Sequence, residues 1–104
     1  MGKYTNKIFY KVKGLLCYMK PILMFMLKGC PYCKKAFNWM EELKNEDPKY
    51  AEIEVQMVDE QEQAELAEKY DYFYVPTYYV DGEKVHEGAA TKEIIKQVFD
   101  KALE

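Results

Sequence analysis

Several features that would assign this chain to a common class are missing or scarce. The 104 residues hold three cysteines, one histidine and a single Cys-x-x-Cys pair. An odd number of cysteines cannot form a complete disulfide framework, which argues against secretion. A structural zinc site needs about four ligands, and the soft or imidazole candidates are Cys17, Cys30, Cys33 and His86. We therefore expect no metal site and no tightly bound cofactor.

Long apolar runs and an excess of positive charge are missing as well. No window reaches the length of a membrane span. Lysines and the Lys20-Pro21 step interrupt the apolar residues near the N-terminus, which disfavours a signal peptide. A formal net charge of −3 argues against nucleic acid as the main partner. The 49% hydrophobic content is that of a globular domain, and we expect a cytoplasmic monomer without a membrane span.

The first part of the chain can be interpreted in two ways. Apolar residues recur at helical spacing after Ile8, and they also alternate over residues 8–12 as in a strand. A basic amphipathic helix can lie on an anionic membrane surface. The apolar face of such a helix would be short here, which favours an added element that packs on the core. Residues 1–19 are therefore interpreted as an extension, and residues 20–104 as the main domain. Cys17 is interpreted as a buried free thiol, with a regulatory thiol as the alternative.

The cysteine pair follows an apolar run. Residues 22–28 predict a strand buried on both faces, and residues 31–45 predict an amphipathic helix. Pro31 suits the first helical position because its missing N–H costs nothing there. A strand that leads into a Cys-x-x-Cys at the start of a helix is typical of thiol–disulfide exchange.

Helix geometry gives the two thiols different roles. Cys33 shares a helix face with Phe37 and Met40, so we expect it to be buried. Cys30 precedes the first turn, where unpaired N–H groups and the positive end of the helix dipole favour a thiolate. Every charged residue before Glu41 is a lysine, which predicts a basic surrounding from Lys28, Lys34 and Lys35. We infer that Cys30 attacks and that Cys33 resolves.

The remaining chain predicts a second strand and helix and then a hairpin. Ile53, Val55 and Met57 alternate with polar residues as in a half-exposed strand. Asp59 can cap a helix that runs to about Tyr70. A hairpin turn at Asp81-Gly82 and a last helix capped by Thr91 follow. The order β-α-β-α-β-β-α predicts an α/β protein with a four-stranded mixed sheet flanked by helices.

Three motifs in this order resemble a known family. They are Cys30-Pro31-Tyr32-Cys33, Val75-Pro76-Thr77 and the hairpin from Asp81-Gly82 to Gly88. Residues 20–104 resemble the thioredoxin-fold superfamily and are most similar to glutaredoxin-like proteins. The resemblance implies a thiol–disulfide oxidoreductase that reduces protein disulfides or glutathione mixed disulfides. Glutathione or a thioredoxin reductase would then donate the electrons.

The resemblance also implies a substrate site around the cysteines. Pro76 would be cis, and the backbone of Val75 would pair with an extended peptide or with glutathione. Tyrosines between Tyr70 and Tyr79 could form a peptide surface, with Tyr72 and Tyr74 as the best candidates. The complete set of expected substrate-binding residues is Lys28, Pro31, Tyr32, Tyr74, Val75, Pro76 and Gly88.

The chain departs from both branches of this superfamily. Gly88-Ala89-Ala90-Thr91 lacks the acidic residue with which glutaredoxins hold glutathione, and Gly29 and Met24 replace the tryptophan and the buried acid of thioredoxins. The electron donor is therefore left open. The rival from another class is an iron–sulfur, metal-binding or thiol-carrier module, which Tyr32 disfavours by analogy.

Overall fold

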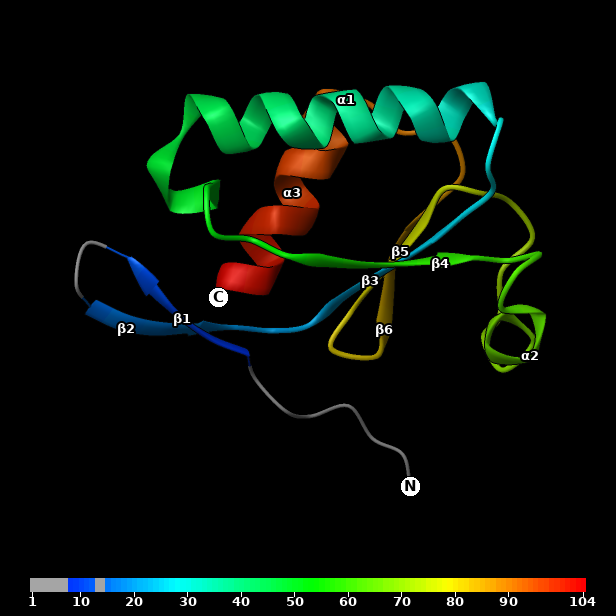
Figure 1. Ribbon diagram of the computed structural model, residues 1–104, viewed down its shortest axis with the longest axis horizontal. Helices are drawn as coiled ribbons and strands as arrows, with labels where there is room; N and C mark the ends of the chain where they lie inside the picture. The colour runs from blue at the N-terminus through cyan, green and yellow to red at the C-terminus, as the bar shows by residue number, and fades with distance from the viewer. Residues whose placement is uncertain (1–7, 13–14) are drawn as a thin grey trace.

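The computed structural model describes residues 8–12 and 15–104, with side chains from Met19 onward. Figure 1 shows a twisted sheet with α1 along one side and α2 at one end. The strands are β1 (Ile8–Val12), β2 (Leu15–Met19), β3 (Ile22–Met26), β4 (Val55–Asp59), β5 (Thr77–Val80) and β6 (Glu83–Glu87). The helices are α1 (Pro31–Glu46), α2 (Ala64–Ala67) and α3 (Lys92–Leu103), with a 3-10 turn at Pro48–Tyr50.

The main sheet has four strands in the order β4-β3-β5-β6. β3 pairs with β4 in parallel, and β5 pairs antiparallel with both β3 and β6. This confirms the predicted fold class and mixed sheet. Phe25 near the end of β3 lies opposite Thr77 at the start of β5. The Cys30 turn and the segment before β5 therefore leave the sheet at the same edge.

Alternate residues of the strands fill two apolar layers. Met24 and Tyr78 are fully buried on the face that α1 and α3 cover. Phe25 and Val58 are fully buried on the opposite face, against Ala67 of α2. The strict alternation follows from the two-residue period of a strand, and it explains why β3 is apolar throughout.

The extension contains a strand hairpin. β1 and β2 pair antiparallel and form a separate two-stranded sheet, so the strand interpretation of residues 8–12 was the right one. The Lys20 amide donates to the Ala102 carbonyl of α3 at 2.8 Å, and Met19 is 1% exposed. The added element therefore packs against the core. Residues 1–7, residues 13–14 and the side chain of Cys17 lie outside the described part.

Two local predictions were wrong. The helix after Asp59 is the single turn α2 and does not run to about Tyr70, although the Asp59 carboxylate makes the predicted cap hydrogen bonds, accepting from the amides of Gln61 at 2.8 Å and Glu62 at 3.1 Å. Met57 is 50% exposed although its alternation predicted an inward side chain. It belongs to β4, the strand at one edge of the sheet, and the neighbouring Val58 is the buried side chain.

The turn between β5 and β6 agrees with its sequence. Asp81 has φ of 53° and Gly82 has φ of 83°. Two successive positive φ angles are the conformation that Asp-Gly favours in a two-residue hairpin. The hairpin places Gly88, just after β6, beside Pro76.

Candidate active site

The turn between β3 and α1 holds the cysteine pair at the helix N-terminus. Gly29 has φ of 85°, a left-handed conformation that glycine adopts without strain. The Cys30 amide donates to the Leu27 carbonyl at 3.2 Å, and the Cys30 carbonyl accepts from the Lys34 amide at 3.0 Å. Cys30 is thus the N-cap residue, with Pro31 at the first helical position.

The two thiols are both free and lie in different environments. Cys30 is half-buried, whereas Cys33 is 1% exposed, as its helix face predicted. Burial raises the pKa of Cys30, but the amide and thiol of Cys33 and the amide of Tyr32 outweigh it and hold that pKa below its usual value. Burial raises the pKa of Cys33 to about 11. At neutral pH the Cys30 sulfur is therefore the better nucleophile.

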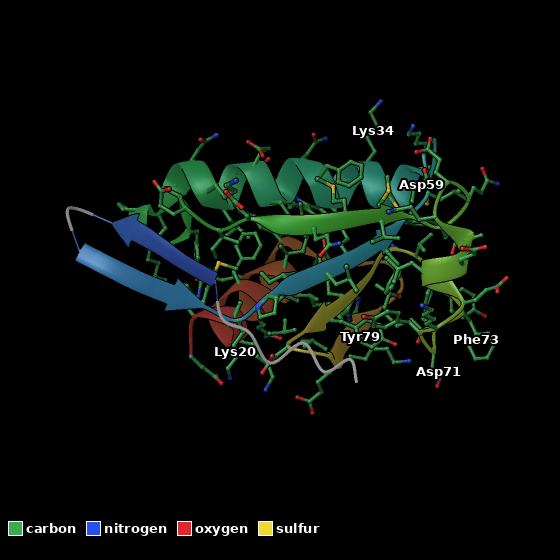
Figure 2. All side chains as sticks on the ribbon, turned by 60° about the horizontal axis from the view of Figure 1, so that its bottom comes forward. Lys20, Lys34, Asp59, Asp71, Phe73 and Tyr79 are labelled. Atoms are coloured by element: carbon green, nitrogen blue, oxygen red, sulfur yellow. The ribbon has the colours of Figure 1, made fainter. Side chains whose placement is uncertain are left out.

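The charges around the pair differ from the basic environment that the sequence predicted. Lys28 is exposed and forms an ion pair with Glu62, and Lys34 points away from the sheet in Figure 2. The negative charge of Glu60 opposes the ionisation of both thiols and so contributes an upward shift to the pKa of each. For Cys30 this contribution is smaller than the lowering by the amides. Glu60 in turn accepts a hydrogen bond of 2.9 Å from the Tyr72 hydroxyl. The lowered pKa of Cys30 thus comes from helix amides and the neighbouring thiol.

Asp59 joins two loops at this edge of the sheet. Besides the amides of Gln61 and Glu62, its carboxylate accepts from the Lys28 amide at 3.3 Å. Hydrogen bonds from the Glu62 amide, and also from those of Gln61 and Lys28, hold the pKa of Asp59 below its usual value against the effect of burial. An ionised carboxylate therefore fixes the Cys30 turn to the loop after β4.

The segment before β5 provides the second side of the site. The Val75-Pro76 peptide bond is cis, which confirms the expectation from the resemblance. The Gly88 amide donates to the Pro76 carbonyl at 2.8 Å, and Gly88 has φ of 95°. Val75 and Cys30 are both half-buried against the same apolar cluster. The fold thus gathers Cys30, Val75, Pro76 and Gly88 at one edge.

Three aromatic rings of α1 and of the segment before β5 are exposed. Tyr32 is 55% exposed, Tyr74 is 69% exposed and Phe73 is 85% exposed. Tyr72, in contrast, stacks on Phe25 with ring centroids 4.7 Å apart. Of the two tyrosines proposed for a peptide surface, Tyr74 is exposed, whereas Tyr72 is partly buried and packs against the core.

Sequence reasoning missed Phe73 and Glu87. Glu87 accepts hydrogen bonds from the Phe73 amide at 2.6 Å and the Tyr74 amide at 3.0 Å. These bonds span 14 and 13 residues, so no local motif could have indicated them. Phe73 lies within the aromatic segment from Tyr70 to Tyr79, but the sequence of that segment does not reveal which rings are exposed and which are buried.

Membrane spans and metal-binding clusters were both sought among the described residues. In the part of the chain that the structure describes, no helix is long and apolar enough to cross a membrane. Among the same residues, no three His, Cys, Asp or Glu side chains come together as a metal site would require.

Comparisons with known proteins place this site in a family. A sequence model named Glutaredoxin matches residues 22–85. A thioredoxin from Methanocaldococcus jannaschii is 33% identical over 82 residues, which are 79% of this chain and 94% of that protein. The oxidised thioredoxin from Plasmodium falciparum has a TM-score of 0.60 and 27% identity, covering 80% of each chain. A mutant thioredoxin from Halobacterium salinarum has a TM-score of 0.59 and 25% identity, covering 80% of this chain and 74% of the other.

Proposed function

The chain belongs to the glutaredoxin family of thiol–disulfide oxidoreductases, and on that premise we propose that it reduces protein disulfides with Cys30 as nucleophile and Cys33 as resolving thiol. The observation that carries the proposal is the difference between the two sulfurs. The half-buried Cys30 thiol has a lowered pKa at the start of α1, and the pKa of the buried Cys33 thiol is about 11.

The reaction proceeds in two exchanges that conserve electrons. The Cys30 thiolate attacks one sulfur of the substrate disulfide, forms a mixed disulfide and releases the other sulfur as a thiolate. Cys33 then loses its proton and attacks the Cys30 sulfur. This step forms the Cys30–Cys33 disulfide and releases the second substrate thiolate, so that two electrons pass to the substrate. The burial of Cys33 keeps it protonated until the mixed disulfide is in place.

The exposed rings favour a polypeptide as substrate. Tyr32, Phe73 and Tyr74 offer exposed apolar area, and aromatic rings contribute strongly to peptide binding. Tyr32 follows Cys30 by two residues, and Tyr74 precedes Val75, which packs on the same apolar cluster as Cys30. The backbone of Val75 would pair with the extended substrate as a strand does. Lys28, one of the expected substrate-binding residues, forms an ion pair with Glu62, and Gly88-Ala89-Ala90-Thr91 contains no acid. These departures favour a protein disulfide over a glutathione mixed disulfide.

Substitution of each cysteine tests the assignment of roles. Cys30→Ser should abolish the reduction of a disulfide-linked polypeptide, whereas Cys33→Ser should accumulate a mixed disulfide with the substrate, visible by mass spectrometry. The assignment is wrong if Cys30→Ser reduces the substrate as fast as the parent protein, or if the trapped adduct lies on Cys33 in a Cys30→Ser variant.

The electron donor is decided by two coupled assays. Activity on a glutathione mixed disulfide with glutathione and its reductase would identify a glutathione-dependent enzyme. Turnover with thioredoxin reductase would identify thioredoxin-like behaviour. We expect the protein to act as a monomer in the cytoplasm, where thiols are kept reduced. An iron–sulfur role would appear as visible absorbance after anaerobic reconstitution.

A further inference from the structure

The Glu87 side chain at the end of β6 spans the gap to the segment before β5. Its Oε2 atom accepts from the amides of Phe73 and Tyr74, at 2.6 and 3.0 Å. Its Oε1 atom accepts from the Nζ of Lys84 at 2.8 Å, and the same Nζ donates to the Asp71 carbonyl at 3.0 Å. The side chains of Lys84 and Glu87 are 35% and 21% exposed. Lys84 and Glu87 thus hold the segment through three of its backbone groups.

Residues 71–76 belong to no helix or strand, so these bonds replace the pairing that regular structure would provide. Other hydrogen bonds to the backbone of the segment come from the Tyr79 hydroxyl to the Asp71 carbonyl at 2.7 Å, from the Thr77 hydroxyl to the Tyr74 carbonyl at 2.5 Å and from the Gly88 amide to the Pro76 carbonyl at 2.8 Å. In each of these hydrogen bonds a carbonyl oxygen of the segment is the acceptor. The amides of Phe73 and Tyr74, which carry the exposed rings, are held by Glu87.

We propose that Glu87, oriented by Lys84, is a positioning residue that fixes Phe73 and Tyr74 as the surface on which a polypeptide substrate docks beside Cys30. The idea rests on the function proposed above. Hydrogen bonds to an ionised carboxylate are stronger than bonds between neutral groups. The ion pair with Lys84, followed by the Phe73 amide, lowers the pKa of Glu87 to about 2. The carboxylate therefore stays charged throughout the neutral range.

Two substitutions of Glu87 and one matched control test the proposal. Glu87→Ala should speed hydrogen exchange at the Phe73 and Tyr74 amides, followed by NMR, by about tenfold or more, because loss of a charged hydrogen bond corresponds to at least that factor. It should raise the KM for a disulfide-linked polypeptide about tenfold with kcat unchanged. Glu87→Gln keeps the shape of the side chain and a weaker acceptor, so its exchange rates and its KM should lie between those of the parent protein and those of Glu87→Ala. Glu83→Ala, an exposed position on the same strand, should change neither quantity.

The separate readouts distinguish the possible failures. Unchanged exchange at both amides in Glu87→Gln and Glu87→Ala would overturn the proposal, as would a KM that follows the Glu83→Ala control. Alkylation of Cys30 by iodoacetamide should keep its parental rate, so a slower rate would indicate a general disruption and contradict the positioning role. If the parent protein reduces no disulfide, the proposed function fails, whereas the exchange measurement still tests whether Glu87 holds the segment.

Discussion

Cys30 and Cys33 are identical side chains three residues apart, and the start of α1 gives them opposite chemistry. The first sulfur lies beside helix amides at the surface, and the second lies inside an apolar cluster with Ala36 and Met40. Neither effect needs a nearby cation. Lys28 pairs with Glu62 and Lys34 points away from the sheet (Figure 2), so we attribute the activation of Cys30 to the N-terminus of α1.

Thiol labelling at the residue scale tests this account. In a Cys33→Ser variant, iodoacetamide should label Cys30 with a midpoint below pH 8.5, the value of an ordinary thiol, because the amides of α1 favour the thiolate. Mass spectrometry identifies the labelled residue and separates it from Cys17. A midpoint at or above pH 8.5 would show that the helix amides do not activate Cys30.

Replacement of the exposed rings tests the docking surface. Phe73→Ala and Tyr74→Ala should each raise the KM for a disulfide-linked polypeptide by about three- to tenfold, since each ring buries apolar area on binding. The rate with a small soluble disulfide should be unchanged. Tyr72→Ala serves as the contrast, because its ring stacks on Phe25 and its loss should lower the melting temperature. Equal KM values for parent and variants would remove Phe73 and Tyr74 from the site.

At the scale of the elements, α3 begins at a capping side chain. The Thr91 hydroxyl accepts from the Ile94 amide at 3.1 Å, and Ile95, Val98, Phe99 and Ala102 form the buried face of the helix. Thr91→Ala should therefore lower the free energy of unfolding by about 1 kcal/mol, the usual value of an N-cap hydrogen bond. Urea denaturation measures this change. Gln97→Ala on the exposed face is the control, and an equal loss there would contradict the capping role.

The whole molecule should lose stability in alkali in its reduced form. The native Cys33 thiol has a pKa of about 11, whereas the unfolded thiol ionises near pH 8.5. Above pH 8.5 the native state therefore binds more protons than the unfolded state, and the free energy of unfolding falls as pH rises through this window. Chemical denaturation between pH 8.5 and 10 should show the decline. The oxidised protein has no Cys33 thiol to ionise, so an equal decline there would refute the explanation.

The sequence was enough to predict the order of the elements and the cysteine pair because those signals are local. The apolar run before Cys30, the Asp81-Gly82 turn and the Thr91 cap each act within a few residues. Met57 was mispredicted because alternation along a strand does not reveal that the strand lies at the edge of the sheet. The helix after Asp59 is shorter than predicted even though its predicted cap hydrogen bonds are present. The role of Glu87 depends on amides 13 and 14 residues away, which no short motif reveals. The cis bond at Pro76 was expected from family resemblance alone.

The Asp59 carboxylate has a consequence for the kinetics of association. It binds the Lys28 amide of one loop and the Gln61 and Glu62 amides of another, so neither loop can shift without breaking a bond to the other. We therefore expect the Cys30 turn to keep its position when a substrate arrives. Encounter with this protein should be limited by diffusion and orientation, and the lifetime of the complex should be set by the rings that the substrate covers.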